Sequence, residues 1–260
     1  MSDDHRSIEL EIEVPGSPEE VWEAIATGPG ISSWFVPHTV EEREGGAATA
    51  RFGPGPEMEV PGRVAAWEPP HRVLFDGGEG VEGLAFEWLV EARDGGTCVV
   101  RLVNTGFGSG GEWDDQYDGM TEGWLMFLAN LKLHLTHFRG QAARAGLPSA
   151  VWARTRDDSW SALTEALGIP VTLAVGDRVE VHAAEAPALA GTVAEVGPFR
   201  LVLVVDEPAP GTALVAVEGG GAQVSVSVWS YLYGAAGAAA VERDEPRWTQ
   251  WLTSRAPTDG

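Results

Sequence analysis

The sequence contains only one cysteine, Cys98, among its 260 residues. A single cysteine cannot form a disulfide within the chain. Cys98 lies in an apolar segment, Thr97 to Val103, with the composition of a strand. We therefore predict a small buried side chain at this position rather than a nucleophile.

Basic residues are scarce as well. The chain has 17 Lys and Arg against 39 Asp and Glu, which gives a formal net charge of −22. Proteins that bind nucleic acids need a basic surface to replace the counterions of phosphate. We therefore expect no nucleic acid and no membrane among the partners, and we attribute the acidity mainly to solubility.

Long apolar runs are missing too. No stretch of 18 apolar residues occurs, so we expect no transmembrane helix. The first residues, Met1 to Arg6, are polar and acidic, unlike a signal peptide. Together with the lack of a disulfide, these features favour a cytoplasmic location. An apolar content of 44% is still sufficient for a core.

Recognisable catalytic and metal-binding motifs are also lacking. The glycine-rich segment Gly106 to Gly111 has neither the P-loop lysine nor the dinucleotide spacing, and no serine lies in Gly-x-Ser-x-Gly. His134 and His137 lie three residues apart without a third ligand, so we interpret them as a solvated helix face.

Acidic residues gather at the start of the segment that carries these histidines, at Asp114, Asp115, Asp118 and Glu122. They lack the spacing of a calcium loop, and the dipole of a helix N-terminus favours acids there in any case. We predict no metal and no cofactor, and we assign no catalytic residue.

What the sequence does contain is a clear order of strands and helices. Residues 7–14 alternate between apolar and charged, as in a half-buried strand. Ser17, Pro18 and Glu20 form the signature of a helix start with a capping box. A short second helix is expected near residues 30–35, then strands near 37–43, 46–53, 57–67, 72–77, 84–93 and 97–104. A long amphipathic helix over 115–138 follows, with apolar residues three and four apart.

This order resembles a known superfamily in four stretches. They are Ser17 to Trp22 with Trp34-Phe35, Gly62 to Pro70, Asn104 to Phe107, and Gly123-Trp124 with the leucines of the last helix. The chain resembles the SRPBCC (START-like) proteins, in the branch related to the activator of heat-shock-protein-90 ATPase. The resemblance implies an α+β helix-grip fold, a curved antiparallel sheet around a long C-terminal helix, over residues 1–140. It implies a cavity but no particular reaction.

Residues 141–149 are predicted to be a linker, and residues 150–260 a smaller α+β domain. A shift of 129 residues aligns Gly62-Arg63-Val64-Ala65 with Gly191-Thr192-Val193-Ala194, and Trp248, Trp251 and Leu252 repeat the spacing of Trp124, Phe127 and Leu128. Two interpretations are open: a trimmed helix-grip repeat, or a chance match between two strand segments rich in Gly, Val and Ala. A different strand order in the second half would exclude the repeat.

A helix-grip fold leaves a concave, largely apolar space between the sheet and its long helix. We expect the wall of this cavity to be formed by Trp34, Phe35, Trp67, Phe75, Phe86, Trp88, Arg101, Trp124, Phe127, Leu128 and Leu131. Asn104, His71 and Asp76 are further polar candidates. The alternative is that the aromatic side chains simply fill the core.

The favoured function is the non-enzymatic binding of a small hydrophobic or aromatic molecule. An enzyme of the cyclase or hydratase type is one alternative, and it would need an ionisable pair in the cavity with shifted pKa values. A chaperone cofactor or regulatory protein-interaction module is another, and it would expose a contiguous apolar patch. A protein partner or a homodimer also remains open.

Overall fold

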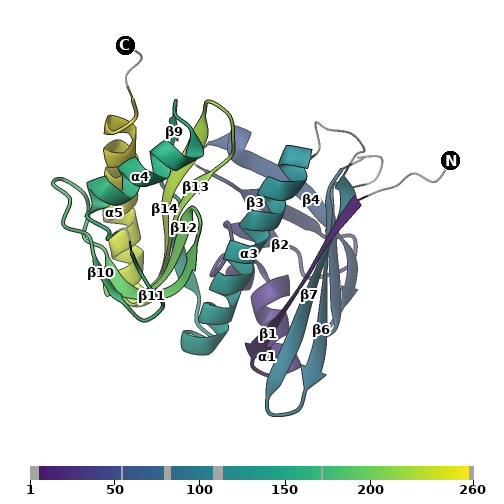
Figure 1. Cartoon of the computed structure of the whole chain (residues 1–260). Helices are drawn as coiled ribbons and strands as arrows, with labels where there is room; N and C mark the ends of the chain where they lie inside the picture. The colour runs from purple at the N-terminus through teal and green to yellow at the C-terminus, as the bar shows by residue number, and fades with distance from the viewer. Residues whose placement is uncertain (1–5, 54, 79–82, 108–113, 171, 258–260) are drawn as a thin grey trace. The chain divides into compact units, whose positions relative to one another are not determined.

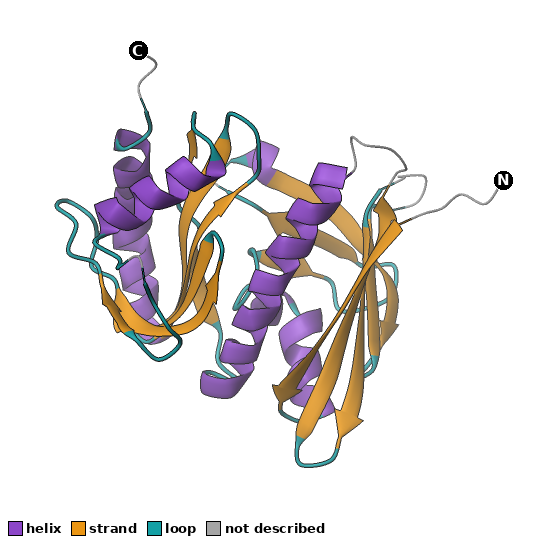
Figure 2. Ribbon diagram, in the orientation of Figure 1, coloured by secondary structure: helices purple, strands orange, loops and turns teal. Residues whose placement is uncertain are grey.

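The computed structural model describes residues 6–53, 55–78, 83–107, 114–170 and 172–257 (Figure 1). The chain divides into two compact units, Met1–Ala142 and Ala143–Gly260. Each contains one antiparallel sheet with helices, which is the predicted α+β class (Figure 2). Residues 1–5 of the polar start and residues 108–111 of the glycine-rich segment lie outside the described residues, as do the side chains of 114–116, including Asp114 and Asp115.

The first unit contains the elements that the sequence predicts, in the predicted order. They are β1 (Arg6–Pro15), α1 (Pro18–Ala26), α2 (Gly28–Ile31), β2 (His38–Val40), β3 (Ala47–Arg51), a 3-10 turn (Pro56–Met58), β4 (Glu59–Glu68), β5 (Arg72–Asp76), β6 (Ala85–Arg93), β7 (Thr97–Phe107) and α3 (Asp114–His137). The strands follow the order β1-β7-β6-β5-β4-β3-β2. α3 packs along β1, and α1 packs against β6 and α3. This confirms the helix-grip arrangement.

The start of α1 shows how local sequence fixes an element. The Glu20 amide donates to Ser17 Oγ at 3.3 Å, and the Ser17 amide donates to Glu20 Oε2 at 2.8 Å, which is the predicted capping box. Pro18 occupies the first turn, where a missing N–H costs no hydrogen bond. The Arg139 guanidinium reaches Glu20 Oε2 at 3.0 Å and so ties the chain after α3 to the start of α1.

α3 presents its apolar side chains to the core, as its spacing predicts. Trp124, Phe127, Leu128, Leu131 and Leu135 are all buried. The solvated-face interpretation holds for His137, which is exposed. It is wrong for His134, because that side chain is only 3% exposed. Burial lowers the pKa of His134 to about 4, since the charged imidazolium would lose its hydration.

The predicted linker is partly a strand instead. Residues 143–146 form β8 (Ala143–Gly146), which pairs with a strand of the second unit. The segment Ala-Arg-Ala-Gly-Leu-Pro-Ser has the composition of a linker, but its backbone completes a sheet. Cys98 is fully buried, as predicted, and burial raises the pKa of its thiol.

The second unit repeats the topology of the first, but two short strands, β8 and β9, pair with its last strand in the place of β1, and its meander has one strand fewer. After β8 come β9 (Ser149–Trp152), α4 (Arg156–Leu167), β10 (Arg178–Glu180), β11 (Ala190–Gly197), β12 (Arg200–Glu207), β13 (Gly211–Glu218), β14 (Val224–Tyr233) and α5 (Gly234–Ser254). The sheet order is β8-β14-β13-β12-β11-β10, and β9 also pairs with β14. The first strand therefore pairs with the last, and the rest form a meander, as in the first unit.

A shared irregularity strengthens this correspondence. The ladder between β4 and β5 shifts register between Val64 and Ala66, and the ladder between β11 and β12 shifts between Val193 and Glu195. These positions are related by the shift of 129 residues that the sequence suggested. Beyond the following turn the shift between corresponding residues becomes 128, because Glu68 pairs with Arg72 whereas Gly197 pairs with Arg200. The constant shift of 129 residues therefore does not extend into the next strand.

Candidate ligand-binding site

The first unit contains a cavity of about 440 Å³. Side chains and backbone from α1, α2, the β2–β6 region and α3 form its wall. The residues that line it are Ile25, Ile31, Trp34, Phe35, His38, Ala50, Phe52, Val60, Pro61, Phe75, Gly77, Gly83, Leu84, Phe86, Trp88, Met120 and Trp124. A volume of this size is typical of sites for small organic molecules.

Aromatic rings in mutual contact form much of this wall. Trp88 meets both Trp34 and Trp124 edge to face, with ring centroids 5.5 Å apart in each pair. Phe35 lies 5.0 Å from Trp124, and Phe86 lies 5.5 Å from it. Such pairs add about 0.5–1.5 kcal/mol each beyond the burial of their surface. Contacts between rings therefore stabilise this part of the wall.

Hydrogen bonds fix two of the three indoles in the wall, Trp124 and Trp34. Trp124 Nε1 donates to Asn104 Oδ1 at 3.2 Å, and the Asn104 amide donates to the Ala85 carbonyl at 3.1 Å. Trp34 Nε1 donates to the Ala24 carbonyl at 2.8 Å. Asn104 is completely buried on β7, so it acts behind the wall by orienting Trp124.

The cavity reaches solvent at the β3–β4 hairpin. Phe52 and Val60 line the cavity, yet they are 39% and 54% exposed. Met58, 38% exposed, lies beside them, and its carbonyl accepts a hydrogen bond from the Phe52 amide. Exposed apolar side chains at a cavity mouth offer a path for an apolar molecule to enter.

A smaller hollow of about 110 Å³ adjoins the cavity and shares His38, Ala50 and Phe75 with it. Arg63 and Asp76 line this hollow and form a two-point ion pair, with Nε–Oδ1 at 2.9 Å and Nη2–Oδ2 at 3.3 Å. The hydrogen bonds from Arg63 hold the pKa of Asp76 below its usual range, so the carboxylate stays charged.

The structure brings six of the eleven predicted wall residues together around the cavity: Trp34, Phe35, Phe75, Phe86, Trp88 and Trp124. Phe127 contacts Phe35 from behind, with ring centroids 4.5 Å apart, and Leu128 and Leu131 are buried on α3. Trp67 instead packs edge to face on Trp22 of α1 at 4.9 Å. These four residues support the core around the cavity rather than line it.

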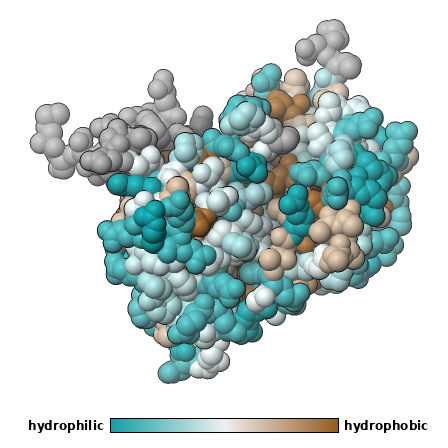
Figure 3. Space-filling view, turned by 180° about the vertical axis from the view of Figure 1, so that it is seen from behind, coloured by the Kyte–Doolittle hydropathy of each residue, from teal (hydrophilic) through white to brown (hydrophobic). Residues whose placement is uncertain are grey.

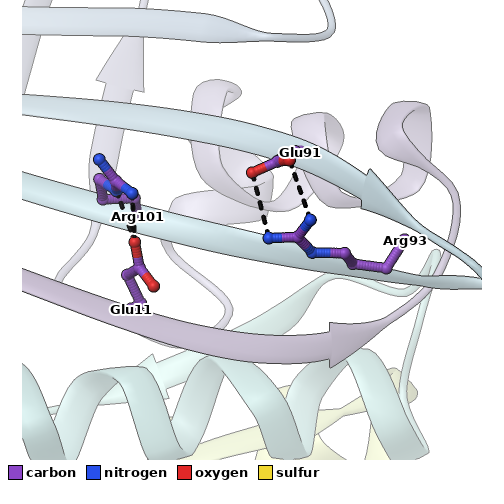
Figure 4. A network of polar contacts seen from close by, with 4 residues as sticks. All are labelled: Glu11, Glu91, Arg93 and Arg101. Atoms are coloured by element: carbon purple, nitrogen blue, oxygen red, sulfur yellow. Dashed lines mark hydrogen bonds and ion pairs between the residues drawn. The ribbon is translucent and has the colours of Figure 1, made fainter.

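Arg101 lies on the opposite face of the sheet, which corrects its predicted position (Figure 4). Its buried neighbours on β7 are Cys98, Val100, Leu102 and Asn104, so the alternation of the strand turns Arg101 outward. Arg101 Nε donates to Glu11 of the paired strand at 2.7 Å. Of the further polar candidates, Asn104 orients Trp124 and Asp76 lines the smaller hollow, while His71 is exposed.

Several wall residues have no counterpart among the predictions. Ala50, Gly77 and Gly83 contribute little side chain, and their place in the wall depends on how the strands curve. His38 starts β2 and is separated from the short α2 by residues 32–37. No motif or periodicity distinguishes it in the sequence.

The second unit uses the matching helix positions differently. Trp248, Trp251 and Leu252 of α5 are buried in one apolar core with Val193 and Leu203 of the sheet. The Trp248 and Trp251 rings meet edge to face at 5.7 Å. In this unit the side chains of α5 therefore fill the space between the helix and the sheet.

Other features of the described chain bear on function. No described helix is long and apolar enough to cross a membrane. Within the described ranges, no three His, Cys, Asp or Glu side chains are grouped as metal ligands. The face drawn in Figure 3 is predominantly hydrophilic, with hydrophobic residues confined to limited areas.

Comparison with known proteins shows what the first unit is similar to. Residues 15–136 match the family of activator of Hsp90 ATPase homolog 1-like proteins. No curated protein matches the chain significantly. Among solved structures, the Aha1 dimer from Colwellia psychrerythraea is 20% identical over 52% of this chain and 99% of its own, with a TM-score of 0.44.

Two similar solved structures extend over both units. BexL, a di-domain ARO/CYC from the BE-7585A biosynthetic pathway, is 14% identical over 98% of this chain and 100% of its own, with a TM-score of 0.45. DynU16, from the dynemicin biosynthetic locus, is 18% identical over 96% of each chain, with a TM-score of 0.43. The family match lies within the first unit, which is therefore similar to activator of Hsp90 ATPase homolog 1-like proteins and has the helix-grip strand order of the SRPBCC type.

Proposed function

We propose that the first unit binds a small, mainly apolar molecule with at least one aromatic ring in the 440 Å³ cavity. The observation that carries the proposal is the ring cluster of Trp34, Phe35, Phe86, Trp88 and Trp124, which borders an open volume instead of filling it. A core built only for stability would close such a space, because each lost contact costs dispersion energy.

The chemistry of the wall favours binding. Among the described residues that line the larger cavity, His38 alone is ionisable. The charged groups of the adjoining smaller hollow, Arg63 and Asp76, neutralise each other. A charged ligand would lose hydration without gaining a partner of opposite charge. A neutral molecule is therefore the best fit, and we propose a carrier or sensor role rather than catalysis.

A fluorescence titration with the neutral dye N-phenyl-1-naphthylamine tests the proposal. The dye becomes strongly fluorescent in an apolar site. The test variant is Ala50→Phe, which places a ring in the cavity from the middle of β3. Its matched control is Ala47→Phe, which makes the same change at an exposed position of the same strand.

The unchanged protein and Ala47→Phe should bind the dye with similar affinity, and Ala50→Phe should bind it about tenfold or more weakly. Circular dichroism spectra of the three proteins should coincide. Equal binding by Ala50→Phe, or an equal loss in Ala47→Phe, would place the dye elsewhere and refute the proposal.

A further inference from the structure

His38 is the ionisable side chain among the described residues of the cavity wall, and its surroundings fix its position. Ser32 Oγ accepts a hydrogen bond from the His38 amide at 2.9 Å and donates to the Gly28 carbonyl at 2.6 Å, so α2 holds the start of β2. The approach is close: a Cβ at Gly28 would lie 2.9 Å from the His38 carbonyl oxygen. The ring stands beside Phe35, with centroids 5.6 Å apart.

The hydrogen bond of the ring determines its tautomer. His38 Nδ1 lies 2.7 Å from the Val36 carbonyl oxygen. A carbonyl oxygen can only accept, so Nδ1 carries the proton and donates. Burial lowers the pKa of His38, which keeps the imidazole neutral near pH 7. Nε2 is then left with a lone pair.

That lone pair has no partner among the described residues, since the hydrogen bond of the ring is made through Nδ1. The ring lines both the cavity and the smaller hollow. The other ionisable groups of these walls, Arg63 and Asp76, are bound to each other. An acceptor in a largely apolar wall gains most from a donor on the bound molecule.

We propose that His38 Nε2 accepts a hydrogen bond from a hydroxyl group of the bound molecule, so that the cavity selects neutral hydroxylated aromatic compounds. This inference rests on the proposed function of the cavity. A ligand without the hydroxyl would cover Nε2 and leave it unsatisfied, and it should therefore bind about tenfold more weakly.

Isothermal titration calorimetry with 2-naphthol and 2-methoxynaphthalene tests the inference. The two probes share a ring system, but only 2-naphthol donates a hydrogen bond. The proteins compared are the unchanged chain, His38→Phe, and the control His71→Phe, which makes the same substitution at an exposed histidine. The unchanged chain and His71→Phe should favour 2-naphthol about tenfold. His38→Phe should lose that preference, mainly by binding 2-naphthol more weakly.

The possible failures are distinguishable. Equal affinities in the unchanged chain, or a preference that survives in His38→Phe, would overturn the role of His38 while leaving the cavity as a binding site. If neither probe nor the naphthylamine dye binds the unchanged chain, the proposed function itself fails.

A second measurement needs no variant. Long-range ¹H–¹⁵N spectra of the histidine rings should show His38 as the Nδ1–H tautomer. The Nε2 resonance should then move upfield with 2-naphthol but not with 2-methoxynaphthalene. A protonated Nε2 in the free protein would overturn the inference.

Discussion

Replacing His134 by glutamine should remove a large part of the pH dependence of the stability of the first unit. The side chain is 3% exposed on α3, and burial lowers its pKa to about 4, against an ordinary value of 6.5. Between these two pH values the unfolded chain binds a proton that the folded chain does not. Stability therefore rises with pH across this window and is lost as pH falls through it.

The magnitude follows from the two pKa values. Each pH unit between them changes the free energy of unfolding by about 1.4 kcal/mol. Lowering the pH from 7 to 4.5 should therefore cost the unchanged protein about 2.5 kcal/mol through His134 alone. Carboxylates with lowered pKa values, such as Asp76 and Glu20, also lose stabilisation as pH falls. They are present in both proteins, so the difference between the proteins isolates His134.

Urea unfolding at pH 7 and pH 4.5 measures this difference. Pulse-labelling hydrogen exchange, read on peptides from residues 6–107, reports the first unit by itself. His137→Gln, an exposed change on the same helix, is the control and should retain the pH dependence of the unchanged protein. The same pH dependence in His134→Gln as in the unchanged protein would refute the account of His134 as a neutral buried group.

Two further predictions concern Asn104 and Arg101. Asn104→Leu should lower the free energy of unfolding of the first unit by about 3 kcal/mol, because it leaves Trp124 Nε1 and the Ala85 carbonyl unpaired in the interior. It should also weaken dye binding. Urea unfolding and the dye titration measure the two effects, and unchanged values would contradict the orienting role of Asn104. Arg101→Ala should change the free energy of unfolding by only about 0.5 kcal/mol, since solvent screens the ion pair of Arg101 with Glu11. Dye binding should be unchanged. A loss of dye binding would show that Arg101 does line the cavity.

Local sequence signals account for much of the fold. The capping box at Ser17 and Glu20 and the apolar spacing of α3 each depend on residues a few positions apart, and both predictions are confirmed. The failures arise where tertiary context decides. Residues 143–146 have weak strand character but pair with β14. His134 is buried because the face of α3 that packs against the rest of the unit includes polar positions beside its apolar residues.

Residues of the cavity wall could be predicted from the sequence where they have large apolar side chains. The large inward rings, such as Trp88 and Trp124, lie in it, whereas Ala50 and Gly83 depend on how the strands curve and could not be inferred. Arg101 was misplaced because both faces of β7 carry valines, Val99 and Val103 on one side and Val100 on the other, so the apolar pattern does not show which face points inward. His38 depends on the tertiary placement of α2 beside β2.

The sequence suggested that the second unit repeats the first, but it could not distinguish a repeat from a chance match. The match of Gly62 to Ala65 with Gly191 to Ala194 has the composition of any strand. The shared register shift at Val64 and Val193, together with the corresponding strand order, favours a repeated topology over a chance match.

The most direct test of the central claim is an NMR measurement of the complex with 2-naphthol. In protein labelled at its alanine and leucine methyl groups, bound naphthol protons should show nuclear Overhauser effects to Ala50 and Leu84, which line the cavity. They should show none to Ala47, or to Leu252 in the core of the second unit. Effects to Ala47 or Leu252, or none to Ala50 and Leu84 at saturation, would contradict the claim that the aromatic cavity of the first unit is the binding site.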